Sequence, residues 1–489
     1  MLNILVPDFR VIAPELILVG TAFAIILWEM ITRTRKHGVS VILAIAGTVV
    51  ALVVTTGLSQ FNISTFGDSL VLDPFASFFK MIFLLGLLMT IAISSRFIDE
   101  GGVREHAEYY ALLILAVVGM MVLATGRELV NVFLGLELMS MSLYILAGMF
   151  KTDPRSNEAS MKYFILGSFA TGFLLFGMSY IYGITGSTHY SQISQVISDN
   201  PALLEDKGLL LGLFTLLIGF AFKIAAVPFH QWTPDVYEGA PTSVTAFMAA
   251  GPKAAAFAAL IRVLMEALPQ MKGDWELLFT ILAIVTMTLA NLVALSQDSV
   301  KRMLAYSSIA HVGYILIAFV ASVGGHADRA LSAILFYLLA YTFMNTGAFG
   351  ILIFLKREGI SGEKLDDFAG LSRRSPMGAL AMLIFLFSLA GIPPTAGFAA
   401  KLSIFYAAVQ GGYYTLVVIG ILNSAVAAYY YLRVVVFMYM KEPETDLAYA
   451  GTSPLLWAGI ALALAGTIVL GVLPGGVLEA ARLSVLSLL

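Results

Sequence analysis

The most regular feature of the sequence is a succession of long apolar segments separated by short polar ones. Most segments are close to the 20 residues with which an α-helix crosses a hydrocarbon core of about 30 Å. They are continuous, whereas the strands of a membrane β-barrel alternate apolar and polar residues. The pattern therefore predicts an all-α polytopic membrane protein with about 14 transmembrane helices. The fourteen runs lie at about 12–32, 39–58, 75–96, 109–125, 128–150, 159–183, 208–228, 243–267, 276–296, 302–322, 329–355, 377–407, 415–438 and 454–475.

Composition supports this prediction. Of the 489 residues, 59% are apolar and only 12% are charged, about half the charged share of a soluble domain. These proportions exclude a soluble multi-domain enzyme and a disordered chain. The net charge of −3 gives no reason to expect a nucleic-acid partner, and the absence of cysteine excludes disulfides, thiolate metal sites and cysteine-ligated clusters. The first run is followed by RTRKH rather than a cleavage site, which indicates a retained span.

Basic residues are distributed unevenly between the two sets of loops. Fifteen lysines and arginines fall in loops that follow odd-numbered runs, against six in the other loops and the termini. Cytoplasmic loops of membrane proteins carry the excess of basic residues. Both termini are therefore expected on the outer side.

The order of the runs indicates an internal repeat within a single transmembrane domain, 1–489. Residues 1–100 would hold helices 1–3, 105–270 a first five-helix repeat (helices 4–8), 273–440 a second (helices 9–13), and 450–489 helix 14 and the C-terminus. The fourth helix of each block is interrupted by proline and carries a lysine, in GFAFKIAAVPFH and LAGIPPTAGFAAKLSIF. A block of five inserts inverted relative to the other, and broken helices at matching places mark the ion pathway of many transporters.

One acidic residue falls deep inside a predicted span. Glu137 follows Glu128 by nine residues, or about 13.5 Å of helix, which brings it near the middle of the membrane. Ionisable groups at that depth cost about 2.5–3.5 kcal/mol or more and are usually functional. A structural carboxylate satisfied by a neighbouring helix is the alternative for Glu137.

Lysines in three other spans suit proton exchange. Lys223 lies five residues before Pro228, which is expected to free a helix carbonyl; Lys253 directly follows a proline; and Lys401 follows the GIPPTAGF break. Lysine in a low-dielectric interior can exchange a proton near neutral pH. A pair formed by Glu137 and such a lysine is therefore predicted to act as a proton-transfer switch.

The remaining polar residues of the spans are ambiguous from sequence alone. Lys162 is close enough to the end of its span to reach the interface, so functional and structural roles are equally compatible with its position. His311 is either a proton relay or a hydrogen-bonded core histidine. Lys80, Arg262 and Arg433 are expected to be interfacial anchors. No Walker loop, dinucleotide fingerprint or paired haem-ligand histidines are found, so neither cofactor binding nor a metal site is expected on this chain.

The segment KIAAVPFHQWTPDVYEGAP at 223–241, with SMKYFILGSFA before it and KRMLAYSSIAHVGY after it, resembles the antiporter-like membrane subunits of respiratory complex I. Within that family WTPDVYEGAPT is similar to the N type, whereas the L and M types tend to have WLPxAHxxAP. A basic residue at Lys401 also suits the N type, since the M type is expected to carry an acid there. The resemblance covers nearly the whole chain.

The resemblance implies a role for each matching residue. Glu137 would be the family's fifth-helix glutamate, Lys223 its seventh-helix lysine partner and Lys162 the sixth-helix lysine between them. Lys253 would be the central relay lysine and Lys401 the terminal residue toward the outer half-channel. His311 would be a further relay on the same axis.

The resemblance also implies the chain's partners and surroundings. It would be a non-redox subunit of a proton-translocating NADH:quinone oxidoreductase in the bacterial inner membrane, beside the antiporter-like M subunit and small subunits such as K. NADH, FMN, iron–sulfur clusters and quinone are expected on partner subunits. Two alternatives remain open: a free-standing cation/proton antiporter of related fold, and the same subunit in a complex with another electron donor. A solute carrier is less consistent with a chain of charges.

Overall fold

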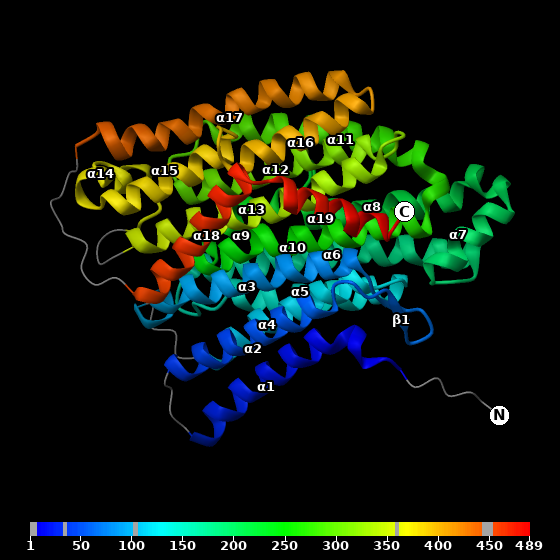
Figure 1. Ribbon diagram of the computed structural model, residues 1–489, viewed down its shortest axis with the longest axis horizontal. Coiled ribbons are helices and arrows are strands. Elements are labelled where there is room, and N and C mark those ends of the chain that lie inside the picture. Colours follow the sequence, from blue (N-terminus) through cyan, green and yellow to red (C-terminus); the bar gives the residue numbers. More distant parts are fainter. Residues whose placement is uncertain (1–6, 33–36, 101–105, 357–360, 443–452) are drawn as a thin grey trace.

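In the computed structural model of the protein, residues 7–32, 37–100, 106–356, 361–442 and 453–489 are described. They form an elongated bundle in which most of the long helices run along the longest axis (Figure 1). Its α-helices are α1 (Ala13–Thr32), α2 (His37–Leu58), α3 (Pro74–Glu100), α4 (His106–Thr125), α5 (Leu129–Ala147), α6 (Pro154–Thr185), α7 (Tyr190–Asp199), α8 (Lys207–Ile224), α9 (Trp232–Gly239), α10 (Thr242–Arg262), α11 (Lys272–Ala294), α12 (Val300–Ala321), α13 (Ala327–Leu355), α14 (Leu371–Arg374), α15 (Pro376–Ala390), α16 (Ala396–Gln410), α17 (Tyr414–Met440), α18 (Pro454–Val472) and α19 (Gly475–Leu486).

The only sheet in the described ranges is a short hairpin between α2 and α3. Strands β1 (Ile63–Thr65) and β2 (Leu70–Leu72) pair antiparallel, with Ile63 opposite Leu72. In the described part of the chain, four 3₁₀ turns and one π turn complete the secondary structure. The 3₁₀ turns are Phe9–Ile12, Pro201–Glu205, Pro269–Met271 and Leu365–Phe368, and the π turn is Val263–Ala267.

The predicted membrane spans are confirmed. Among the described residues, 13 helices are long and apolar enough to cross a membrane. The run predicted at 377–407 is divided into α15 and α16, each of 15 residues, or about 22 Å. The other break predicted from sequence separates α8 from the short helix α9.

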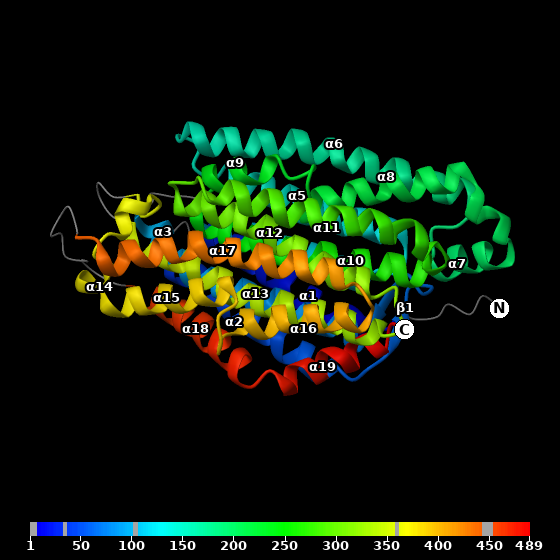
Figure 2. The same ribbon diagram turned by 90° about the horizontal axis from the view of Figure 1, so that it is seen from above.

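Burial distinguishes central from peripheral helices. The apolar windows of α10 and α13 are completely buried and that of α12 nearly so, whereas only one third of the residues in the windows of α1, α2 and α18 are buried. Helices α10 and α13 lie inside the bundle in both of two perpendicular views (Figures 1 and 2). Helices α1 and α17 lie at opposite edges in Figure 1, and α6 and α18 lie at opposite edges in Figure 2. The central helices carry Lys253 and His311, so these two residues lie in the core of the bundle.

Candidate functional site

Lys223 lies in the last turn of the broken helix α8. Ala225 adopts a left-handed conformation with φ of 62°, and the N–H of Ala226 donates to the carbonyl of Ala221 at 2.8 Å, which closes the helix end. The free carbonyls of a helix C-terminus stabilise a cation in this turn. The prediction that Pro228 interrupts this helix is wrong, because the helix has already ended at Ile224.

The ammonium of Lys223 has hydroxyl partners from the neighbouring helix α5. It donates to Ser140 Oγ at 2.8 Å and to Tyr144 Oη at 3.4 Å, and the residue is only 4% exposed. Glu137 lies one turn before Ser140, is half-buried, and accepts a hydrogen bond from Thr171 Oγ1 at 2.8 Å. Glu137 is close enough to Lys223 for an electrostatic interaction. The structure therefore brings these two predicted partners together, with Ser140 bonded to the lysine.

The second break repeats the geometry of the first. Helix α15 ends at Ala390, Gly391 is left-handed with φ of 89°, and the N–H of Ile392 donates to the carbonyl of Phe387 at 2.9 Å. Lys401 comes from the following helix α16 and donates to the carbonyl of Ala390 at 2.9 Å. Lys401 therefore places its ammonium group at the C-terminal end of a half-helix, and Lys223 belongs to the last turn of the other half-helix, where the helix dipole favours positive charge.

Lys253 is held by the neighbouring helix α12. Its ammonium donates to the carbonyl oxygen of Ser308 at 3.0 Å and also bonds to the hydroxyl of the same serine. Lys253 is 3% exposed. Its partners, like those of Lys223 and Lys401, are neutral.

Helix α12 presents polar side chains at successive turns between Lys253 and Lys401. Ser308 bonds to Lys253, His311 follows three residues later, and Tyr314 three residues after that, with its ring 4.7 Å from Lys401 Nζ. Residues three apart lie on one face of a helix. The stripe Ser308–His311–Tyr314 therefore lines the interval between the two lysines.

His311 is buried among tyrosines. Its Nδ1 lies 2.6 Å from the hydroxyl oxygen of Tyr337 and its Nε2 3.3 Å from that of Tyr431. Each phenol can donate or accept, and so can the two nitrogens of a neutral imidazole. Both interpretations made from the sequence, a relay and a hydrogen-bonded core histidine, fit these contacts.

Other buried cations in the described part of the chain have carboxylate partners. Lys80 is paired with Glu15 at 2.7 Å, Arg262 with Asp73 at 3.0 Å, and Lys301 lies 2.9 Å from an oxygen of Glu363. The prediction that Lys80 and Arg262 are interfacial anchors is wrong, since both side chains are completely buried and ion-paired.

Arg433 fits the anchor prediction better. It is partly exposed and pairs with Asp298 at 2.9 Å, near the end of α11. Within the described ranges, Lys223, Lys253 and Lys401 thus differ from the structural cations, because they form no ion pair.

Lys223, Lys253 and Lys401 are called the lysine row below. Lys162 is not part of this row. It is paired with Glu158 and Asp235, each at 2.7 Å, and its side chain is 39% exposed. Arg302 contacts Asp235 and Glu238 in the same cluster, which lines a cavity of about 230 Å³. Burial alone would raise the pKa of Asp235, but its bonds to Lys162 and Arg302 outweigh this effect and hold the pKa below its ordinary value. The carboxylate therefore stays ionised at neutral pH.

Aromatic rings fill the first break between Lys223 and Lys253. Tyr163 stacks on Trp232 with ring centroids 4.5 Å apart, and Trp232 meets Tyr237 edge-on at 5.9 Å. The ring of Tyr163 lies 5.9 Å from Lys223 Nζ and that of Tyr237 5.8 Å from Lys253 Nζ. The two ammonium groups are thus connected by a row of three rings.

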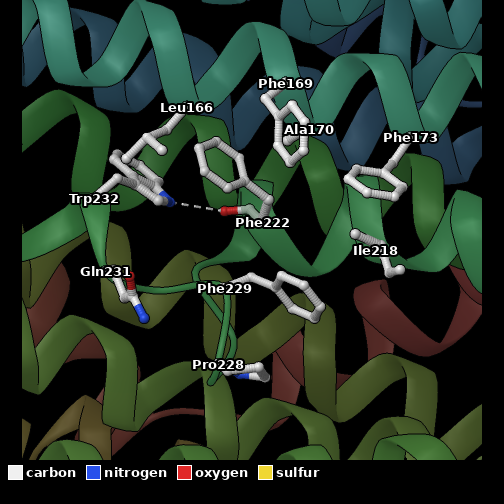
Figure 3. A pocket seen from close by; sticks show the side chains of 10 residues that line it. All are labelled: Leu166, Phe169, Ala170, Phe173, Ile218, Phe222, Pro228, Phe229, Gln231 and Trp232. Atoms are coloured by element: carbon white, nitrogen blue, oxygen red, sulfur yellow. Dashed lines mark hydrogen bonds between the residues drawn. The ribbon is translucent and has the colours of Figure 1, made fainter.

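An apolar cavity of about 270 Å³ lies beside the row of rings, with Trp232 in its lining (Figure 3). Phe169 and Phe173 of α6 and Phe229 of the break line it, and the indole N–H of Trp232 donates to the carbonyl of Phe222 at 3.1 Å. The lining has no charged side chain. The polar contacts of Lys223 are instead made by Ser140 and Tyr144 of α5.

Sequence reasoning missed most of the neutral partners. Ser140, Ser308 and Tyr237 are common residue types that carry no charge signal. The spacing in YSSIAHVGY, with Ser308, His311 and Tyr314 three residues apart, is the one signal that would have identified part of this set.

Comparisons with known proteins agree with the geometry. Residues 126–427 match the family described as NADH:quinone oxidoreductase/Mrp antiporter, transmembrane. NADH-quinone oxidoreductase subunit N of Trichlorobacter lovleyi is 46% identical over 98% of this chain and 97% of its own length. The subunit N of Chloroflexus aggregans is 45% identical over 96% of each chain.

A solved structure extends the comparison to three dimensions. A chain of respiratory complex I from Thermus thermophilus is 34% identical, with a TM-score of 0.79 over 95% of this chain and 98% of its own. The relatives match nearly the full length of the chain, and the family match at 126–427 includes both breaks. The chain belongs to the family of NADH-quinone oxidoreductase N subunits.

Proposed function

We propose that protons move through this subunit along Glu137, Lys223, Lys253, His311 and Lys401, and that the charged cluster around Lys162 collects them. The chain is a membrane-arm subunit of NADH-quinone oxidoreductase, a proton-translocating enzyme. The observation that carries the proposal is the contrast between two kinds of buried cation. The structural cations are fixed by carboxylates, whereas among the described residues Lys223, Lys253 and Lys401 have only hydroxyl and carbonyl hydrogen-bond partners.

The chemistry of the partners explains why this contrast matters. A carboxylate at 3 Å fixes the charge of a buried ammonium, because separating the pair or neutralising one member leaves the other charge unpaired. A hydroxyl can donate to a neutral amine as readily as it accepts from an ammonium. Serine and tyrosine partners therefore suit a lysine that changes its protonation state.

The energy for proton movement comes from outside this chain. Moving one charge against a membrane potential costs about 2.3 kcal/mol per 100 mV. We propose that quinone reduction in partner subunits alters the field at Glu137, shifts its interaction with Lys223, and drives a proton by way of Lys253 and His311 toward Lys401. Glu137 supports this role because it is half-buried, so a neighbouring subunit can approach it more closely than it can approach the three lysines.

The proposal includes the surroundings of the subunit. The M subunit and small subunits such as K would flank it, and NADH, FMN, iron–sulfur clusters and quinone would reside on partners. We place it in the inner membrane of a bacterium with both termini on the periplasmic side, on the basis of its loop charges. The two five-helix blocks at 105–270 and 273–440 would be inverted repeats, an assignment supported by the matching ends of α8 and α15.

The test is a pair of variants in the assembled complex. Lys223→Ala and Glu137→Gln should lower quinone reduction and proton uptake by closed vesicles together, with the complex still intact. Arg373→Ala is the control, because Arg373 is exposed and contacts only an exposed glutamate in the described ranges, at 3.4 Å. If both activities are unchanged in intact complexes carrying the two variants, these residues are structural ions and the proposed path is wrong.

The electron donor needs a separate measurement. Identity of 46% over nearly the full length to a subunit N argues against a free-standing antiporter. Purification of the tagged chain should yield a complex that oxidises NADH with a quinone acceptor. A complex that oxidises only another donor would assign the chain to a sister enzyme.

A further inference from the structure

A proline inside α10 leaves one backbone carbonyl without its helical partner. Pro252 has no N–H, so it cannot donate to the carbonyl of Met248, four residues earlier. That carbonyl is buried in a helix whose apolar window is completely enclosed. A buried carbonyl without a donor costs about 1–3 kcal/mol. A donor from elsewhere in the fold is therefore needed here.

The donor is a tyrosine of the neighbouring break. The hydroxyl of Tyr237, on the short helix α9, donates to the carbonyl oxygen of Met248 at 3.1 Å. Tyr237 is completely buried, and its own carbonyl accepts a hydrogen bond from Thr245 Oγ1 at 2.8 Å, which ties α9 to the first turn of α10. The bond between Tyr237 and Met248 thus crosses from the break to the turn that precedes Pro252.

Lys253 is the competing donor for the same carbonyl. It directly follows Pro252, and side chains on an α-helix lean toward the N-terminal turn. Its ammonium lies 5.8 Å from the ring centroid of Tyr237, although it bonds to Ser308 on α12. If the hydroxyl of Tyr237 were absent, the carbonyl of Met248 would attract this ammonium.

We propose that Tyr237 is a positioning residue for proton transfer, because its hydroxyl occupies the carbonyl of Met248 and so leaves Lys253 free to face Ser308 and the His311 stripe. The inference rests on the proposed function of Lys253. It assigns a role to the hydroxyl of Tyr237, and it explains why Tyr237 lies next to a proline-interrupted turn.

The test combines a loss with a specific rescue. Tyr237→Phe keeps the ring but removes the hydroxyl, and it should lower quinone reduction per assembled complex about three- to tenfold, the scale of one hydrogen bond. The KM for quinone should not change, because quinone binds elsewhere. Pro252→Ala restores an N–H that can donate to the carbonyl of Met248, so the double variant should regain most of the activity of Pro252→Ala alone.

The control is another buried, hydrogen-bonded tyrosine that contacts α10 at a distance from Lys253. The hydroxyl of Tyr109 lies 2.9 Å from Ser243 Oγ, and Tyr109→Phe should retain turnover. Unchanged turnover in Tyr237→Phe would overturn the proposal. Failure of Pro252→Ala to rescue Tyr237→Phe would also overturn it, since the hydroxyl would then act on something other than the carbonyl.

Two further comparisons keep the interpretation clear. If Tyr237→Phe prevents assembly, restoration of assembly in the double variant supports the same carbonyl contact, and continued failure refutes it. Lys253→Ala separates this inference from the proposed function. If Lys253→Ala abolishes turnover while Tyr237→Phe has no effect, only the inference about Tyr237 fails, whereas normal turnover in Lys253→Ala removes the basis for both.

Discussion

The ion pair between Asp73, which directly precedes α3, and Arg262 of α10 allows a sharp test of which buried charges are structural. Both oxygens of Asp73 accept from Arg262 Nη2 at 3.0 Å, and neither side chain is exposed. Arg262 also donates to Glu266 at 2.6 Å. Asp73 accepts the backbone N–H of Ala76 at 2.7 Å at the start of α3. Asp73→Asn removes the charge but retains an oxygen for this helix cap.

The expected cost follows from these contacts. Removing one partner of a buried ion pair costs about 3–5 kcal/mol, and we expect the lower value of about 3 kcal/mol because Glu266 continues to neutralise Arg262. Since Asp73 joins helices that must separate on unfolding, the inactivation half-life of the complex at a fixed high temperature should fall by about two orders of magnitude. Turnover per intact complex at moderate temperature should remain within about twofold of normal.

Asp68→Asn provides the matched control. Asp68 contacts Arg127 at 3.6 Å and its side chain is 45% exposed, so the loss of this pair should cost at most about 1 kcal/mol. Asparagine also tolerates the left-handed backbone at this position, where φ is 69°. Equal half-lives for the Asp73→Asn and Asp68→Asn complexes would refute the structural assignment of the Asp73–Arg262 pair.

Three further variants test the lysine row. Ser308→Ala removes the hydroxyl partner of Lys253 but leaves the backbone carbonyl, so quinone reduction per complex should fall about two- to tenfold, and no change would show that the hydroxyl is dispensable. Gly391→Ala places a methyl group 2.9 Å from Lys401 Cδ at a φ of 89°. It should lower the stability of the complex by at least about 1 kcal/mol and also lower turnover. A stable, fully active variant would show that the contact between Gly391 and Lys401 does not constrain the site. His311→Phe removes both contacts with tyrosine hydroxyls and should abolish vesicle proton uptake if His311 is a relay, whereas retained uptake with lowered stability would identify a core histidine.

The membrane fold was predictable because a hydrocarbon solvent constrains it so strongly. Nearly every backbone group of a span must be satisfied within the protein, mostly by its own helix, so long apolar runs map directly onto helices. The regions of both breaks were also recognisable from nearby prolines, although Pro228 lies beyond the end of α8. The point at which α8 ends was not, because the left-handed turn at Ala225 occurs at a residue type that rarely adopts it.

From the sequence, the site was predictable only in its lysines, Glu137 and His311. Lys223, Lys253 and Lys401 stand out because lysine is rare in an apolar run, but the same signal marked Lys80 and Arg262, which have carboxylate partners. What separates the two groups is the partner on another helix, such as Ser308 for Lys253 and Asp73 for Arg262. Pairings of that kind depend on tertiary packing, so they could not be predicted from composition and periodicity.

The long separation between Asp73 and Arg262 also has a consequence for membrane insertion. Arg262 lies 189 residues after Asp73, and a buried charge whose partner is missing is strongly destabilising. At about 5–20 residues per second of synthesis, α3 waits roughly 10 to 40 s for α10. Helix α3 therefore reaches its final packing only after more than half of the chain has been made, and the biogenesis of this subunit depends on keeping α3 accessible during that interval.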